Sequence, residues 1–138
     1  MRIALYEPEI AGNVGAVLRL GACLGAAVDL IEPMGFAWDD RRVRRTAMDY
    51  IDHVLDTRDD GFEAFRATIG SSRLLLFTTK ATQSAYDFAF QPDDILLFGK
   101  ESAGVPVDVA AHCDARLLIP IRSEVRSMNL ATTVALAL

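Results

Sequence analysis

Residues 97–106 read LFGKESAGVP, and the prediction of the fold depends mainly on this segment. Its first two residues end the mainly apolar segment 94–98, which predicts a buried strand. Two glycines, a charged pair and a proline follow this strand. A short helix is predicted at 107–112, and such a strand and helix need only a few residues between them. A loop this elaborate is therefore expected to contact a ligand or a partner.

On both sides of this loop, short apolar runs alternate with helical patterns, which is typical of βαβ units and a mainly parallel sheet. Strands are predicted at 2–6, 28–31, 73–78, 94–98 and 116–119, with a weaker one around 51–55. Helices are predicted at 12–25, 39–48, 60–69, 107–112 and 128–138. The sequence thus predicts one α/β domain over 1–138, with a Rossmann-like layer of sheet between helices.

Polar and small residues mark the expected helix ends. Asn13 lies near the start of the first helix, and Gly25 is placed to end it. Ser127 or Asn129 can cap the terminal helix, which then runs to Leu138 without a Gly, Asn or basic residue to stop it.

The composition is that of an ordinary globular protein. Of 138 residues, 51% are apolar and 24% charged, enough for a core without disulfides. Cys23 and Cys113 form no CxxC pair and the two histidines are isolated, so no metal site is expected. The start lacks a signal-peptide pattern and no apolar run approaches the roughly 18 residues of a membrane span, so a cytoplasmic location is expected.

The net charge of −5 argues against a protein that coats nucleic acid nonspecifically, because that function requires phosphate neutralisation. The net charge does not exclude a local basic patch or a basic face that is assembled across a dimer.

Two further loops share the expected position at the carboxyl ends of strands, where α/β sheets bind ligands. One is EPEIAGNVG at 7–15, followed by Arg19, and the other is LIPIRSEVRSMNL at 118–130. Neither a GxGxxG nor a GxxxxGK[ST] pattern is present. These residues alone indicate an α/β nucleotide-binding domain of unknown ligand, with an oxidoreductase as the default function.

Taken together, the three loops resemble the three motifs of SpoU-type SPOUT RNA methyltransferases. The matching patterns are N-x-G-x-x-x-R at 13–19, F-G-x-E-x-x-G-V-P at 98–106, and I-P followed by S-M-N at 119–129. The segments YEPEI at 6–10, IEPMGFAWDD at 31–40, FTTK at 77–80 and RSMNL at 126–130 resemble the TrmL-type enzymes. Those enzymes methylate the ribose 2′-hydroxyl of the wobble cytidine or uridine of tRNA, and the resemblance covers essentially the whole chain.

The resemblance implies a deep trefoil knot near the C-terminus, which general folding rules would not suggest. It also implies that S-adenosylmethionine binds in the loops of the knot, and no metal. The residues carried over as cofactor-binding are Phe77, Gly99, Gly104, Leu118, Ile119, Ser127 and Met128.

For catalysis, the resemblance points to Arg19, with Arg126 as a second candidate. A guanidinium stays protonated in proteins, so we expect Arg19 to hold a phosphate and stabilise negative charge on the ribose oxygen. Glu101 is expected to order its loop and not to transfer a proton. Asn13 and Asn129 are expected to be substrate-binding residues. Asn13 is expected to act chiefly by fixing the first loop through hydrogen bonds to the backbone.

The tRNA-facing surface is expected to include Arg41, Arg44 and Lys80. The arginine run at 41–45 is equally compatible with a solvated face paired to nearby aspartates. The resemblance further implies a homodimer that completes the active site, with the first and last helices as interface. Family members continue past the position of Leu138, so a further C-terminal tail is expected.

Two alternatives remain open at this point. The target could be another tRNA ribose or a ribosomal one, although relatives with such targets usually carry an extra RNA-binding domain. The chain could also be a knotted RNA-binding protein without catalytic activity.

Overall fold

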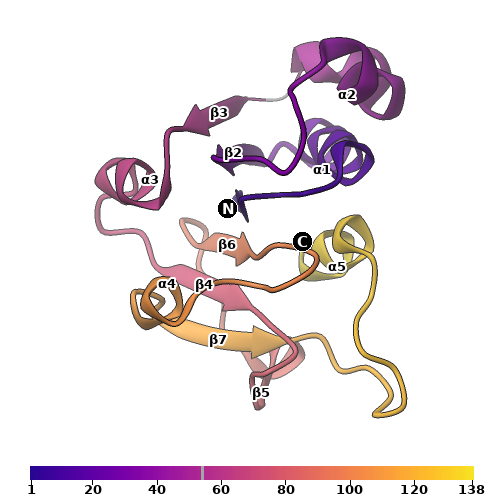
Figure 1. Cartoon of the computed structure of the whole chain (residues 1–138). Coiled ribbons are helices and arrows are strands. Elements are labelled where there is room, and N and C mark those ends of the chain that lie inside the picture. Colours follow the sequence, from indigo (N-terminus) through magenta and orange to yellow (C-terminus); the bar gives the residue numbers. More distant parts are fainter. Residues whose placement is uncertain (54) are drawn as a thin grey trace.

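A single parallel sheet organises the chain (Figure 1). The computed structural model describes residues 1–53 and 55–138, and their side chains except those of Asp40, Arg42, Arg44, Met48, Asp49 and Ile51. Seven parallel strands run in the order β3-β2-β1-β6-β4-β7-β5. Their bounds are β1 Arg2–Tyr6, β2 Ala27–Ile31, β3 Asp56–Asp59, β4 Leu74–Phe77, β5 Gln83–Ser84, β6 Ile95–Phe98 and β7 Ala115–Leu118.

Helices cover both faces of the sheet, as Figure 1 shows. The α-helices are α1 Ala11–Leu24, α2 Asp40–Ala47, α3 Phe62–Thr68, α4 Val107–Ala111 and α5 Leu130–Ala137. Two 3₁₀ helices, η1 Met48–His53 and η2 Ala85–Asp87, complete the elements. α1, α2 and α5 lie on one side of the sheet, and α3 and α4 on the other.

Two cores follow from the alternation of side chains along each strand. In β1, Ile3 and Leu5 point into the core under α1, α2 and α5, while Ala4 and Tyr6 point into the core under α3 and α4. Because both faces are covered, β4 (LLLF) and β6 (ILLF) are apolar at every position. The α/β class and the parallel sheet predicted from the sequence are confirmed.

The prediction of a strand around 51–55 is wrong. Residues 48–53 form η1, and the strand of this region is β3 at Asp56–Asp59. β3 is an edge strand with three exposed residues of four, so no hydrophobic alternation reveals it. The two-residue strand β5 and the helix η2 were not predicted either, because neither is long enough to show a period.

The helix ends are partly as expected. Gly25 ends α1 in the left-handed conformation, with φ 69°, and Asn129 caps α5 by accepting a hydrogen bond from the Thr132 N–H. Asn13 does not cap α1: the helix begins at Ala11 after Ile10, and the Asn13 side chain turns to another loop.

The last segment of the chain returns across the sheet. β7 lies two places from β6, yet α5 packs against α1 and β6 near the middle of the sheet. Residues 119–129 therefore cross the carboxyl edge, and Figure 1 shows them as a long projecting loop before α5. In the described part of the chain no helix has the length and apolarity to cross a bilayer, the longest being the 14 residues of α1.

Candidate active site

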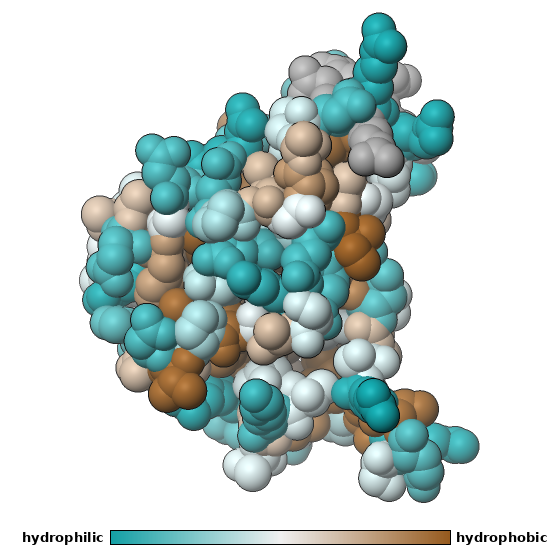
Figure 2. Space-filling view, in the orientation of Figure 1, coloured by the Kyte–Doolittle hydropathy of each residue, from teal (hydrophilic) through white to brown (hydrophobic). Residues whose placement is uncertain are grey.

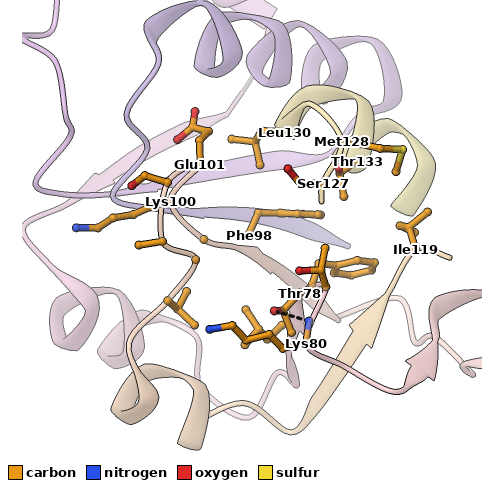
Figure 3. Close-up of a pocket in the computed structure, with 18 of the residues that line it drawn as sticks. Thr78, Lys80, Phe98, Lys100, Glu101, Ile119, Ser127, Met128, Leu130 and Thr133 are labelled. Atoms are coloured by element: carbon orange, nitrogen blue, oxygen red, sulfur yellow. Dashed lines mark hydrogen bonds between the residues drawn. The ribbon is translucent and has the colours of Figure 1, made fainter. Parts of the chain in front are cut away.

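A cavity of about 800 Å³ lies at the carboxyl ends of β4 and β6. Its walls come mainly from three segments: residues 76–80, which include the end of β4, residues 98–105, which begin with the last residue of β6, and residues 127–130, which lead into α5. Figure 3 shows Lys100 and Glu101 on one side of it, and Ile119, Ser127 and Met128 on the other. This is the place where parallel α/β sheets bind ligands.

The floor of the cavity is aromatic. Phe77 and Phe98 end the neighbouring strands β4 and β6 in register, and their rings stack with centroids 4.9 Å apart. Both side chains are almost fully buried, and both are among the residues that line the cavity.

The loop after β6 folds back on itself beside this floor. The Lys100 N–H donates to the Gly104 carbonyl at 3.0 Å, and the Gly104 N–H donates back to the Lys100 carbonyl at 2.9 Å. A Cβ on Gly99 would lie 2.4 Å from the Gly104 carbonyl carbon, and Gly104 has φ 69°. The conformation of this loop therefore requires glycine at both positions.

A hydrogen-bonded chain of side chains joins the three loops. The Glu101 carboxylate accepts from the Glu9 N–H at 2.9 Å and from Asn13 Nδ2 at 3.0 Å. Asn13 Oδ1 accepts in turn from Asn129 Nδ2 at 2.9 Å. Glu101 thus orders the loops, in line with the role expected for it.

An ion pair between Lys100 Nζ and Glu7 Oε2 adds a further link between the loops after β1 and β6. The hydrogen bond to Glu7 is the main cause of the raised pKa of Lys100, which stays charged at neutral pH. Glu7 itself has φ 44°, an uncommon conformation for a residue other than glycine, directly where β1 ends.

The structure brings six of the seven residues expected to bind the cofactor to the cavity wall: Phe77, Gly99, Gly104, Ile119, Ser127 and Met128. Leu118 ends β7 beside Ser84 and is not among the lining residues described. Asn13, Lys80 and Asn129, expected to contact substrate, also line the cavity. Their contacts with cofactor or RNA stay predictions.

The arginines lie elsewhere. Arg19 is exposed on α1, with its guanidinium 5.3 Å from the centroid of the Tyr50 ring. It lines a second, shallower concavity with residues of α1 and α5. Arg126 is exposed on the projecting loop, and Arg41 is exposed at the start of α2, where its N–H donates to Asp39 at 2.9 Å. The Arg44 side chain lies outside the described residues.

Several lining residues were not singled out from the sequence. Thr78 and Thr79 follow β4, while Lys100 and Ser102 lie within the loop after β6. The rule that ligands bind beyond the carboxyl ends of strands points to all four. Leu130 and Thr133 are different, because only the return of α5 across the sheet brings them to the cavity.

A parallel sheet whose last helix returns to its middle, with a glycine loop at its carboxyl edge, defines the class of knotted α/β methyltransferases. The chain belongs to the SpoU rRNA Methylase family, whose profile matches residues 1–138. The family resemblance drawn from the three motifs is thereby confirmed.

Individual relatives are similar over nearly their full length. A tRNA (cytidine(34)-2'-O)-methyltransferase of Beijerinckia indica is 51% identical over 138 residues, covering 99% of this chain and 86% of the relative. The Escherichia coli K12 protein of the same name is 40% identical, with 98% and 87% covered. A solved structure concerning the 2-OH methylation of C/U34 on tRNA superposes with a TM-score of 0.94 at 39% identity, covering 99% and 90%.

Proposed function

We propose that this chain transfers a methyl group from S-adenosylmethionine to the ribose 2′-hydroxyl of nucleotide 34, the wobble position of tRNA. The observation that carries the proposal is the cavity between the glycine loop after β6 and residues 127–130. The similarity to enzymes named for this reaction, over 86% or more of their length, supports the choice of nucleotide.

The cavity suits the cofactor. Its volume of about 800 Å³ lies in the range of about 300–1,000 Å³ typical of small-molecule sites. The Phe77–Phe98 floor suits a flat adenine, and the loop from Gly99 to Gly104 offers backbone groups to polar atoms. The residues proposed to hold the cofactor are Phe77, Gly99, Gly104, Leu118, Ile119, Ser127 and Met128. When bound, S-adenosylmethionine supplies an electrophilic methyl group on a positively charged sulfur.

The chain's own task is to place the ribose hydroxyl in line with that methyl group and to favour loss of its proton to water. Positioning of this kind supplies much of an enzyme's rate enhancement, and a nearby positive charge stabilises the developing oxyanion. Arg19 takes this role, because its guanidinium remains charged and offers several donors in a fork that matches phosphate. Arg126 is a second candidate for a phosphate or substrate contact.

The position of Arg19 outside the cofactor cavity supports a homodimer. Arg19 lines the concavity formed by α1 and α5, whose lining residues are all different from those of the cofactor cavity. Ala131, Ala135 and Leu20 beside Arg19 make this concavity largely apolar. A second copy packed on α1 and α5 would cover these residues and bring each Arg19 toward the cofactor cavity of its partner.

The RNA would lie over the cavity mouth. Asn13, Asn129 and Lys80 line the cavity, and the projecting loop carries the exposed residues Arg122 and Arg126. Figure 2, in the orientation of Figure 1, shows hydrophilic side chains over much of the visible surface, with hydrophobic ones in smaller patches. Arg41 and Arg44 are proposed as outer tRNA contacts. The enzyme is proposed to act in the cytoplasm, where tRNA is modified.

The test is methylation of total tRNA with S-adenosylmethionine labelled on the methyl group, followed by nucleoside mapping. Label on the ribose of nucleotide 34 is the expected result. Label at another tRNA nucleotide would assign a different target ribose. Label found only in a parallel reaction with ribosomal RNA would assign a ribosomal target. Cofactor binding without transfer to any RNA would favour the knotted RNA-binding protein.

A further inference from the structure

The Glu9 carboxylate, in the loop between β1 and α1, is bound by a residue 93 positions later. The Ser102 N–H donates to Glu9 Oε2 at 2.8 Å, and the Ser102 hydroxyl donates to Oε1 at 2.8 Å. Ser102 belongs to the loop that lines the cavity. The two oxygens of one carboxylate therefore fix both the backbone and the side chain of this cavity residue.

The link is reciprocal. The Glu101 carboxylate accepts the backbone N–H of Glu9 at 2.9 Å, just as the Glu9 carboxylate accepts the backbone N–H of Ser102. Bonds to a charged acceptor are about twice as strong as neutral ones. The bonds from Ser102 are also the main reason why the pKa of Glu9 is lowered, so the carboxylate is charged throughout the neutral range.

A third loop supports Glu9 from behind. Gly35, in the turn after β2, donates its N–H to the Pro8 carbonyl at 2.9 Å. A Cβ on Gly35 would lie 2.9 Å from the Glu9 Cα and 3.1 Å from its Cβ and Cγ. The missing side chain at Gly35 thus leaves just enough room for the stem of Glu9 in the orientation that meets Ser102.

We infer that Glu9 is a positioning residue for the cofactor: it holds Ser102, and with it the loop from Gly99 to Gly104, in the conformation that borders the cavity, while Gly35 fixes Glu9 from behind. The inference rests on the proposed function, because the conformation of this loop matters to a cofactor only if one binds there.

A merely structural role would look different. Glu9 belongs to neither core cluster, and its own loop is still held by the bond from its N–H to Glu101. Removing the carboxylate should therefore leave the sheet and both cores in place while freeing the loop that carries Ser102.

The test is calorimetric titration of the full chain with S-adenosylmethionine. Glu9→Ala should weaken binding about tenfold, the loss expected for two hydrogen bonds that act through a positioned loop. Glu9→Gln should stay within about threefold of the original, because its amide oxygen accepts from the Ser102 N–H and its NH₂ can donate to the Ser102 hydroxyl. Glu63→Ala, which removes an exposed carboxylate on α3, is the matched control and should bind normally.

Gly35→Ala is an independent test of the same inference. The added Cβ would displace Glu9, and Gly35 is not itself among the residues that line the cavity. It should weaken cofactor binding as Glu9→Ala does. Should Glu9→Ala fail to fold, Glu9→Asp replaces it, since the charge is kept but the shorter side chain cannot reach both donors. The Tm of each variant without cofactor shows that it is folded, and the rise in Tm on adding cofactor should shrink only for the weakened variants.

Normal affinity in Glu9→Ala would overturn the inference, and so would equal losses in the alanine and glutamine variants. A lack of cofactor binding by the original chain would instead overturn the proposed function, so the two failures are distinguishable.

Discussion

Asn129 and Asn13, 116 positions apart in the chain, are joined by a hydrogen bond of 2.9 Å from Nδ2 of the first to Oδ1 of the second. The other atoms of both amides are also used, since Asn13 Nδ2 donates to Glu101 and Asn129 Oδ1 accepts from the Thr132 N–H. One pair of amides therefore ties the start of α5 to α1 and to the loop after β6. The segment that crosses the sheet is fixed at the point where it ends.

Asn129 has two roles that substitution can separate. Asn129→Ser keeps a side-chain oxygen that can cap α5 but loses the amide NH₂ that reaches Asn13, whereas Asn129→Ala loses both groups. We expect the alanine variant to lose about 1 kcal/mol more unfolding free energy than the serine variant. Methyl transfer should fall by a similar factor in both, because both lose the link to Asn13. Urea unfolding and methylation rates measure the two effects, and normal activity in Asn129→Ser would show that the link is dispensable.

Gly99→Ala is expected to abolish cofactor binding. Its Cβ would lie 2.4 Å from the Gly104 carbonyl carbon, so the loop has to open and its paired backbone hydrogen bonds between Lys100 and Gly104 are lost. Gly12→Ala is the control for a glycine substitution as such, since nothing lies within 4 Å of its added Cβ. Its unfolding free energy should stay the same or rise by up to about 1 kcal/mol, because alanine favours a helix over glycine. Calorimetry for binding and urea unfolding for stability distinguish these outcomes.

The sequence predicted the centre of the fold best. β1 was predicted with its observed bounds, and β4 and β6 within one residue at each end, because buried parallel strands are short and continuously apolar. The polar edge strand β3 and the two-residue β5 carry no such pattern.

The sequence predicted those parts of the site whose residues lie close together in the chain. Gly99 and Gly104 stand in one loop, and both line the cavity as expected. The partners of Glu9 and Gly35 could not be found this way, because those contacts join loops that follow three different strands. The placement of Arg19 outside the cavity likewise depends on which face of α1 it occupies.

Arg19→Ala should lower the rate of methyl transfer by at least about two orders of magnitude, the loss typical when one stabilising donor is removed from a transition state. Cofactor affinity should change less than twofold, because Arg19 does not line the cofactor cavity. Arg66→Ala removes another exposed arginine, on α3, and serves as the control. Near-normal turnover by Arg19→Ala would contradict the catalytic role.

Mixed dimers test whether Arg19 acts on the partner. Arg19→Ala keeps the cofactor cavity, and Gly99→Ala keeps Arg19, so a heterodimer of the two has one complete site only if each site combines residues of both copies. Co-expression of the two inactive variants with different affinity tags, and purification of the mixed species, should restore up to about half the activity of the original dimer, one site of two. An inactive mixed dimer would place Arg19 and the cofactor in the same copy.

The pair of Arg73 and Asp94 should control stability in acid. Asp94 is 1% exposed, accepts two hydrogen bonds of 2.7 Å from Arg73, and has a lowered pKa chiefly because of them. A carboxyl whose pKa is lower in the folded state adds stability above its unfolded pKa of about 3.9, and that stability is lost as the pH falls through the folded value. The unfolding free energy should therefore decline below about pH 5.

Arg73→Met tests this directly, because it keeps an apolar stem against Phe88 and removes the charge. At pH 7 the variant should lose about 2 kcal/mol of unfolding free energy, since the Asp94 carboxylate loses both hydrogen bonds from Arg73 and keeps the one from the Gln91 N–H. The difference between the two proteins should shrink as the pH falls toward 3, where Asp94 of the variant takes up a proton more readily. Urea unfolding at several pH values measures this. A loss that is independent of pH would contradict stabilisation of the Asp94 carboxylate by Arg73 and would point instead to the hydrogen bond from Arg73 to the Ala89 carbonyl.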